Sequence, residues 1–539
     1  MPADRANQVP VVIAGAEPAG LVTAVTLARN GIGSLLVERN PGLSPLPRAT
    51  AVSTRTMELL RSWGLEDEIR AGQLPVAAVG AWTAETLTST EGVLMPLGHP
   101  DFEQATAVSP TGLAAVPQDH LEPVLLRHLE RLGMAEARFG TELVTLDQDT
   151  DGVTVVLREV ATGQERTVRA GYVVGADGAH SRARQLLGIA MEGPDHLNEQ
   201  LTVLFEAPLA EVVGDRRYGI YFVQQPDAAG VFVPNGAGDR WLYGRGWEPE
   251  RERLDDYTDA RLTGLIRTAA GVADLPVRVV AKGAFSFAAQ VAERYRDGRV
   301  FLVGDAAQRM TPRGGMGMNT AIAEGHDLGW KLAWALKGWS GAELLDTYEP
   351  EWRAVGARRA ARSADPGPEA PGAEALADDL NGRLPHAWLA AADGRRRSTL
   401  DLIGPGLTLL TGPDARAWTA AVATLGPPFP LTVHTLDPAA AADLGVDPGG
   451  AVLARPDARV VARWPSAPRS LSLGGPSPHP GYEALHTLVE HRRPLDLYHC
   501  ALEVRVPEGR FVIENAWPIP DAGGDPAPGL LSAGAAPGR

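Results

Sequence analysis

A short glycine-containing turn near the N-terminus lies between a predicted buried strand and a predicted helix. Residues 9–14 (VPVVIA) have the apolar pattern of a strand, Gly15-Ala16-Glu17-Pro18-Ala19-Gly20 forms the turn, and residues 21–30 have a helical pattern. A turn of this kind lets a pyrophosphate approach backbone N–H groups at a helix N-terminus. A second strand, 34–37, ends at Glu38, 23 residues after Gly15. A carboxylate there can accept a hydrogen bond from a ribose hydroxyl, so the segment predicts a dinucleotide site.

One residue of this turn departs from the usual pattern. Glu17 occupies the middle glycine of G-x-G-x-x-G, the position that normally allows close approach to the phosphates. A carboxylate about 4 Å from a phosphate charge costs about 4 kcal/mol at an effective dielectric constant of about 20. We expect Glu17→Gly to tighten cofactor binding, with a gain that shrinks at high salt. Two alternatives are that Glu17 points to solvent or that it caps the helix beginning near Pro18.

Two later segments carry the same chemistry. Asp177 and Gly178 lie in a glycine-rich loop, 175–184, between a strand and a helix, where they can hold polar groups of a cofactor. Asp177 could instead cap the following helix. Asp305 follows Gly304 at the end of strand 300–303, where its carboxylate can bind a ribose or ribityl hydroxyl. The chain then reads Pro312-Arg-Gly-Gly-Met-Gly-Met-Asn319 before a helix. Its glycines allow a flat ring to lie against the backbone, and the helix N–H groups can stabilise negative charge on that ring.

Composition narrows the class of protein. The net charge of −16 makes nucleic acid an unfavourable partner. No apolar run reaches the roughly 18 residues of a membrane span, and the N-terminus lacks a secretory pattern. Cys500 is the single cysteine and the histidines lack metal-ligand spacing, so neither disulfides nor a metal site is expected. The composition therefore predicts a cytoplasmic protein with two or three domains.

Pattern changes along the chain suggest its organisation. We predict a nucleotide-binding region at 1–185, interrupted by an antiparallel sheet at 186–287 and resumed at 288–365 with long helices. Strands are expected at 201–206, 218–223, 230–233 and 240–244, and helices at about 319–336 and 344–361. A separate small α/β domain is expected at 380–465. Residues 466–539 read as a linker, a hairpin around 507–509 and a disordered tail.

The three motifs, in this order and spacing, resemble the class A flavoprotein monooxygenases, the aromatic hydroxylase family with the para-hydroxybenzoate hydroxylase fold. Further matching segments are Pro47-Arg48-Ala49, Pro117-Gln118-Asp119, and the stretch from Tyr295 to Asp305. Residues 383–388, 398–402 and 455–457 look like the thioredoxin-like C-terminal domain of larger members, which often hydroxylate aromatic polyketides or phenols. The resemblance implies a Rossmann-like FAD-binding domain, an inserted antiparallel substrate sheet and this C-terminal α/β domain.

Carried over by position, the resemblance implies non-covalent FAD as cofactor and a set of residues around it. The set consists of Gly15, Glu17, Ala19, Gly20, Glu38, Arg39, Arg48, Gln118, Asp177, Gly178, Gly304, Asp305, Pro312, Gly315, Gly317, Met318 and Asn319. It also implies that NADPH or NADH reduces the flavin, that O₂ gives a flavin C4a-hydroperoxide, and that one oxygen atom passes to an aromatic or polyketide-derived substrate. No catalytic side chain is assigned. Gln308 stands where the family usually has His.

Several alternatives stay open at this point. Hydroxylation is the leading reaction, with epoxidation or Baeyer–Villiger insertion on the same flavin as variants. A non-redox cyclase or isomerase with FAD as a structural wall is a second hypothesis, and a flavin-free binding protein is a third. The residues proposed to line a substrate cavity are Tyr221, Phe232, Tyr243, Phe285 and Met316; a place in the core is the alternative for each. The tail either completes the C-terminal domain or takes part in a homodimer.

Overall fold

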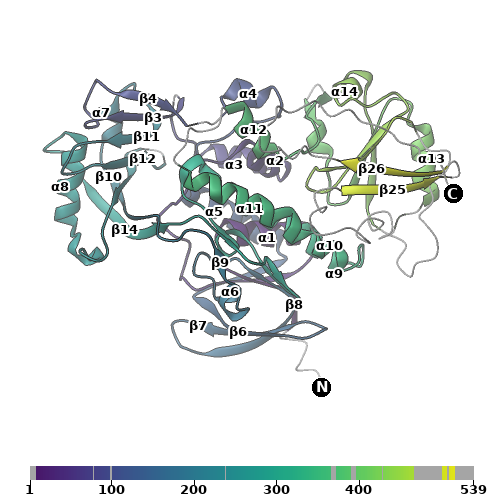
Figure 1. Cartoon of the computed structure of the whole chain (residues 1–539), viewed down its shortest axis with the longest axis horizontal. Helices are drawn as coiled ribbons and strands as arrows, with labels where there is room; N and C mark the ends of the chain where they lie inside the picture. The colour runs from purple at the N-terminus through teal and green to yellow at the C-terminus, as the bar shows by residue number, and fades with distance from the viewer. Residues whose placement is uncertain are drawn as a thin grey trace. The chain divides into compact units, whose positions relative to one another are not determined.

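The computed structural model describes residues 8–76, 78–97, 100–236, 238–365, 372–389, 396–425, 427, 429–466, 500–506 and 509–515. The chain divides into two compact units, one made of residues 1–329 with 351–381 and the other of 330–350 with 382–539. Figure 1 shows the elements of each unit along the chain. Because all the predicted cofactor motifs belong to the first unit, its two large sheets position the candidate site.

The first sheet of this unit begins with the strand that carries the glycine turn. β1 (Gln8–Ala14) lies between β2 (Ser34–Glu38) and β8 (Glu165–Gly175), parallel to both. β17 (Val300–Leu302) pairs in parallel with the other edge of β8. The turns that follow β1, β8 and β17 therefore meet at one edge of the sheet, because the carboxyl ends of parallel strands lie together. The remaining strands are β5 (Ala135–Phe139), β6 (Thr141–Gln148), β7 (Val153–Glu159) and β16 (Arg296–Asp297).

Helices around this sheet follow the patterns of their sequences. α1 (Pro18–Arg29) is buried along almost its whole length, which fits its small and apolar side chains. α9 (Gly317–Leu336) brings Gly325 against α1, where a Cβ would lie 2.5 Å from the Ala19 carbonyl oxygen. The other helices assigned to the first unit are α2 (Thr54–Ser62), α3 (Glu66–Arg70), α4 (Phe102–Thr106), α5 (Gln118–Leu132), α6 (Arg182–Leu186), α7 (Leu209–Val213), α8 (Asp259–Ala270) and α12 (Gly372–Leu380). α10 (Glu343–Asp346) precedes α11 (Tyr348–Ala364), so the helical stretch expected at 344–361 is two helices.

The second sheet has seven strands in the order β14-β10-β13-β12-β11-β3-β4. Four of its strands agree with the predicted ones: β10 (Asn198–Glu206), β11 (Tyr218–Val223), β12 (Gly230–Pro234) and β13 (Arg240–Gly246). β14 (Arg278–Phe287) extends one edge. β3 (Ala78–Ala84) and β4 (Val93–Pro96) come from the region assigned by sequence to the nucleotide part, and β3 pairs in parallel with β11. A small third sheet contains β9 (Met191–Glu192), β15 (Gln290–Ala292) and β18 (Gln308–Arg309).

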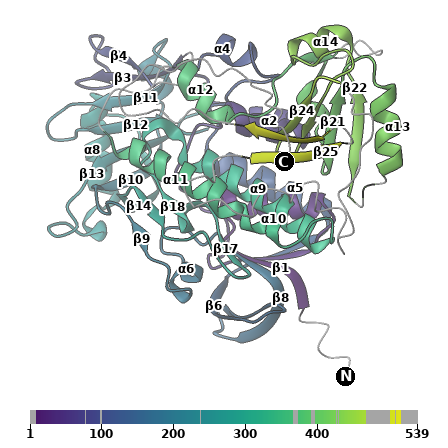
Figure 2. The same ribbon diagram turned by 45° about the vertical axis from the view of Figure 1, so that its right-hand side comes forward.

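The second unit has a four-stranded sheet ordered β22-β21-β23-β24. β21 (Leu407–Thr411) pairs in parallel with β22 (Leu431–Thr435) and antiparallel with β23 (Ala451–Ala454), which pairs antiparallel with β24 (Val460–Trp464). α13 (Arg416–Leu425) and α14 (Pro438–Asp443) connect these strands, as Figure 2 shows. This strand order is that of a thioredoxin-like domain, as expected. β19 (Trp388–Leu389) pairs with β20 (Arg397–Ser398), and β25 (Cys500–Val506) with β26 (Gly509–Asn515) forms the predicted hairpin.

Candidate cofactor and substrate site

The turn after β1 requires glycine at two positions. Gly15 has a φ of +108°, and a Cβ there would lie 2.1 Å from the Ala176 carbonyl oxygen. A Cβ on Gly20 would lie 1.9 Å from the Gly15 carbonyl oxygen. The turn is held by hydrogen bonds from Gly15 N to Val37 O and from Ala176 N to Ala14 O, both 2.7 Å long. The backbone at the start of α1 is therefore open to close approach by a ligand, and the residues present fit a dinucleotide.

Glu38 closes this turn from the neighbouring strand. Its Oε2 accepts a hydrogen bond from Ala16 N at 3.1 Å, and its Oε1 accepts one from Asn40 N at 2.9 Å. The carboxylate is held at the end of β2, where the sequence predicted a ribose contact. Arg39 is exposed beside it.

Glu17 faces Arg48 and is partly exposed. The Arg48 guanidinium lies 2.9 Å (Nη2) and 3.1 Å (Nη1) from the two carboxylate oxygens of Glu17. Glu17 is the N-cap of α1, yet its side chain makes no capping hydrogen bond. Helix capping by this side chain, one alternative raised from the sequence, is therefore wrong, whereas the carboxylate contacts Arg48 and its side chain remains 33% exposed. Partial burial raises the pKa of Glu17, while the Arg48 charge opposes that rise.

Asp305 joins the same group from the other motif. Its Oδ2 lies 4.0 Å from Arg48 Nη1, and its side chain is 44% exposed, so it is accessible to a ligand. Gly304, with a φ of +61°, places this turn against α1, because a Cβ on Gly304 would lie 3.0 Å from the Cβ of Ala19. The structure thus brings together Glu17, Arg48 and Asp305, which are far apart in the sequence.

A buried glutamate on α9 is hydrogen-bonded to the Gly304 turn. Glu324, in the middle of α9, is fully buried; its Oε2 accepts a hydrogen bond from Gly304 N at 2.8 Å. Its Oε1 accepts one from Gln308 Nε2 at 3.0 Å. Burial raises the pKa of Glu324 to about 8. Gln308 is 2% exposed, so its side chain packs in the interior while it holds this carboxyl group.

Asn319 ties the glycine loop to the chain before α2. Its Oδ1 accepts a hydrogen bond from Ser53 N at 2.9 Å, and its Nδ2 donates to the carbonyl oxygens of Ala51 and Gly315, both at 3.0 Å. Gly314 and Gly315 have positive φ values of +75° and +61°. Pro312 precedes this loop and is exposed, and Gly317 and the half-buried Met318 begin α9. The loop is therefore fixed by Asn319 with its glycine backbone accessible.

The Asp177 carboxylate makes its hydrogen bonds within its own loop and the helix that follows. Its carboxylate accepts a short hydrogen bond from the Ser181 hydroxyl and a 2.9 Å bond from Ala183 N, in the first turn of α6. This geometry matches the helix-stabilising alternative for Asp177. Gly178, with a φ of +79°, shapes the same loop. Arg184, which sequence reasoning missed, donates to Ala179 O and Ala306 O at 2.8 and 2.9 Å and so links the loop to the Gly304 turn.

Gln118 begins α5 at the same edge of the sheet. Its backbone N–H donates to Ala49 O at 2.9 Å, one residue after Arg48, and its Nε2 donates to Glu122 Oε1 at 2.6 Å. Glu122 is 2% exposed, and burial raises its pKa to about 7. Glu122 was not singled out from the sequence.

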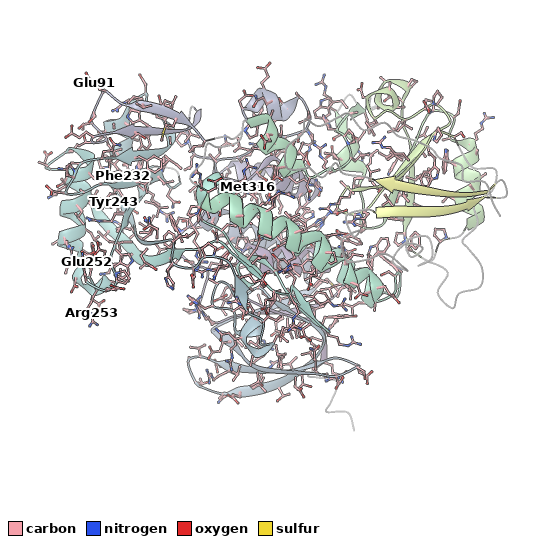
Figure 3. The ribbon with its side chains drawn as sticks, viewed as in Figure 1. Glu91, Phe232, Tyr243, Glu252, Arg253 and Met316 are labelled. Atoms are coloured by element: carbon pink, nitrogen blue, oxygen red, sulfur yellow. The ribbon has the colours of Figure 1, made fainter. Side chains whose placement is uncertain are left out.

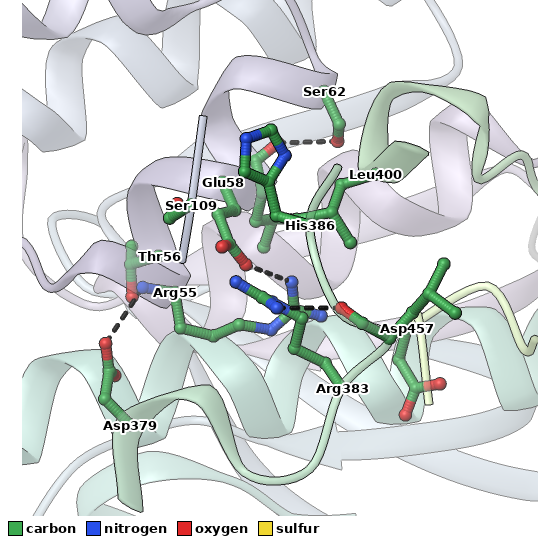
Figure 4. Close-up of polar contacts among 12 residues, drawn as sticks. Arg55, Thr56, Glu58, Ser62, Ser109, Asp379, Arg383, His386, Leu400 and Asp457 are labelled. Carbon is green, nitrogen blue, oxygen red and sulfur yellow. Dashed lines mark hydrogen bonds and ion pairs between the residues drawn. The ribbon is translucent and has the colours of Figure 1, made fainter. Parts of the chain in front are cut away.

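A pocket lies beside the glycine loop. Its lining includes the backbone of 314–316 and apolar side chains from Leu97, Leu113, Met310 and Met316. Charged side chains line it as well: Arg313, Arg359, Arg362, Asp365, Asp378 and Asp379. The Asp379 carboxylate accepts a 2.9 Å hydrogen bond from Arg55 N, and Arg55 pairs with Glu58 at 2.9 Å (Figure 4). The pocket is thus apolar on one part of its wall and polar on another.

Three of the five aromatic and methionine residues predicted to line a substrate cavity are in the core. Tyr221, Phe232 and Tyr243 are at most 2% exposed and pack with α8 in one hydrophobic cluster. They pair across β11, β12 and β13, so they share one face of the sheet. Figure 3 shows Phe232 beside Tyr243 and Met316 apart from both. The cavity prediction is therefore not supported for these three, because α8 covers their face.

Phe285 and Met316 have different surroundings. Phe285 is 44% exposed, and its β14 position falls on the face opposite that cluster. Phe222, next to Tyr221 on β11, is 38% exposed on the same opposite face. Met316 lines the pocket described above.

Among the described residues, no helix is long and apolar enough to cross a membrane. The same residues contain no group of three or more His, Cys, Asp or Glu side chains arranged to hold a metal ion. The turns at the sheet edge thus bring together backbone N–H groups, one arginine and several carboxylates, a set that fits a dinucleotide. The fold and these turns define a two-part flavoprotein with a separate C-terminal α/β domain.

The comparisons with known proteins agree with this class. Residues 8–363 match the FAD binding domain family, and residues 379–474 match the C-terminal domain of aromatic-ring hydroxylases. The chain belongs to the FAD-binding aromatic-ring hydroxylases, and it is an FAD-dependent monooxygenase that uses NADPH or NADH. This confirms the family and the cofactors expected from the sequence.

The alignments with individual relatives span nearly the whole length of each relative. A putative polyketide hydroxylase of Streptomyces halstedii is 38% identical over 85% of this chain and 94% of its own. Aklavinone 12-hydroxylase of Streptomyces purpurascens is 36% identical over 86% and 96%. The crystal structure of aklavinone-11 hydroxylase with FAD and aklavinone superimposes with a TM-score of 0.76, at 35% identity, over 86% of this chain and 96% of that one.

Proposed function

We propose that this chain hydroxylates a polycyclic aromatic polyketide. The observation that carries the proposal is the pocket beside the glycine loop, because it combines apolar and charged walls next to the loop expected to hold the flavin ring. Fused aromatic rings with ketone and hydroxyl groups fit a wall of this mixed kind. The relatives described as polyketide and aklavinone hydroxylases support the same class of substrate.

When bound, FAD supplies O₂ activation with electrons from NADPH or NADH. The chain's own groups would hold it as follows. The Asp305 carboxylate would accept a hydrogen bond from a hydroxyl of the ribityl chain. The Glu38 carboxylate would accept one from a hydroxyl of the adenosine ribose. The N–H groups at the start of α9 would stabilise negative charge on the ring. Asn319 would keep that loop in place through its three hydrogen bonds. The other predicted cofactor residues keep their assignments as part of this proposal, except Asp177, whose carboxylate is bonded within its own loop.

The substrate would meet the flavin at the pocket and at the face of the seven-stranded sheet that carries Phe222 and Phe285. Phe222 and Phe285 expose aromatic surface there, whereas the opposite face is filled by α8. The proposal includes O₂ as co-substrate, a cytoplasmic location, a homodimer formed with the help of the tail, and domain limits near 185, 287, 365 and 380–465.

The test measures NADPH and NADH oxidation by the FAD-loaded protein with a panel of anthracyclinone and related aglycones. We expect at least one aglycone to stimulate oxidation and to gain one oxygen atom by mass spectrometry. Leu113→Trp, which narrows the pocket, should lower turnover, whereas Val160→Trp at an exposed position at the end of β7 should not. Conversion without an added oxygen atom would favour the cyclase or isomerase instead. Absence of conversion with every aglycone would overturn the polyketide assignment.

A further inference from the structure

Arg48 is surrounded by carboxylates at the phosphate turn. Both oxygens of Glu17 contact its guanidinium, at 2.9 and 3.1 Å, and Asp305 approaches to 4.0 Å. Glu122 also acts on Arg48 electrostatically, and Glu38 acts on Glu17. The carboxyl groups of this cluster outnumber its single arginine. A diphosphate would add further negative charge to the same place.

The contact geometry explains how Glu17 is tolerated at a glycine position. A glutamate N-cap can accept hydrogen bonds from the first turn of its helix, but Glu17 makes none. Its carboxylate turns instead toward Arg48, which presents two N–H donors in a fork that fits carboxylate and phosphate equally. The first N–H groups of α1 therefore remain clear of the Glu17 side chain.

We propose that Glu17 is an internal anion that occupies Arg48 in the cofactor-free protein and competes with the diphosphate of FAD for that arginine. The proposal rests on FAD binding at this turn. The Arg48 fork pairs with both oxygens of Glu17, so a diphosphate must displace Glu17 from it or bind with only part of its donors. Removal of the Glu17 charge frees Arg48 for the cofactor.

The proposal predicts tighter FAD binding by a neutral variant of the same size. Apoprotein is prepared from the full-length holoenzyme by stripping the flavin, and FAD is titrated while flavin fluorescence is followed. Glu17→Gln should lower the dissociation constant by about 1.5-fold to fivefold, the range for a partly exposed ion pair. The control Glu142→Gln removes another glutamate paired with arginine, Arg158 across β6 and β7, and should leave the constant unchanged. Thermal unfolding of each apoprotein verifies that it is folded.

An Arg48→Gln background separates competition from simple repulsion. If Glu17 acts by holding Arg48, the gain from Glu17→Gln should fall by at least half once Arg48 is absent. If Glu17 only repels the phosphates, the gain should persist or grow, because the neutralising charge has been removed, and that result overturns the proposal. Weaker or unchanged binding by Glu17→Gln also overturns it and identifies Glu17 as a positioning residue or a bystander. A wild-type apoprotein that binds no FAD would instead contradict cofactor binding itself.

Discussion

The seven-stranded sheet and the cofactor turns bury opposite kinds of side chain. Between the sheet and α8, aromatic and aliphatic groups fill the interior, and the Tyr243 hydroxyl donates to Ala228 O at 2.8 Å. Beneath the turns, the structure instead buries Glu122 and Glu324 and places Glu17 and Asp305 around Arg48. Buried carboxyl groups lower stability unless they are neutral or paired. The apolar core between the sheet and α8 stabilises the fold. The acidic region beneath the turns lowers stability at the place where we propose that the cofactor binds.

The largest contrast between the two interiors should come from Glu324. Its pKa of about 8 in the folded protein lies above the ordinary value of 4.5. Stability from the neutral group is complete below pH 4.5 and is lost as the pH rises toward 8, by at most about 5 kcal/mol. Glu324→Gln should remove this pH dependence, and Glu211→Gln at an exposed position of α7 should not. Urea denaturation between pH 5 and 9 measures it, and parallel profiles for wild type and Glu324→Gln would contradict the assignment.

Removal of an aromatic ring from the apolar interior should have the next largest effect. Phe232→Ala should lower the free energy of unfolding by about 3–5 kcal/mol, because a cavity forms in the core behind the sheet. Phe222→Ala, on the neighbouring strand and the opposite face, should lower it by less than about 1 kcal/mol. Denaturant unfolding of both variants makes the comparison. Equal losses would show that both faces of the sheet are packed alike.

Asp305 tests the acidic region through the cofactor. Asp305→Ala should weaken FAD binding by about 1.5–3 kcal/mol, because charge-assisted hydrogen bonds are the stronger kind. The fold should survive, since the side chain is 44% exposed. FAD titration of the apoprotein provides the measurement, with the exposed Asp274→Ala near α8 as the control. An unchanged affinity would remove Asp305 from the site.

The smallest expected effect concerns one hydroxyl in the apolar interior. Tyr243→Phe should lower stability by about 1–2 kcal/mol, because Ala228 O loses its buried donor. Burial raises the pKa of this hydroxyl to about 12, so no change with pH is expected between pH 5 and 9. FAD affinity should match that of the wild type. Weakened FAD binding in this variant would mean that the two interiors are coupled.

Sequence reasoning recovered the elements whose signals are local. The turn after β1, the strands β11 to β13 and the start of α9 follow from short patterns of glycine and apolar residues. It missed Glu122, Arg184 and Glu324, because an exposed position is the usual expectation for a charged residue. A signal was present for Glu324, since small and apolar residues surround it in Ala321-Ile-Ala-Glu-Gly325.

The order and spacing of the motifs along the chain carried the resemblance to the flavoprotein class, because turns that can hold a cofactor leave a local signal in the sequence. Successive residues of a strand point to opposite faces, so Tyr221 and Phe222 face opposite sides of β11. Which side α8 covers depends on contacts between distant segments, so only the folded chain decided which aromatic residues are core. The partner of Glu17 was likewise decided by the fold, because Arg48 lies 31 residues away and reaches it only once both loops are in place.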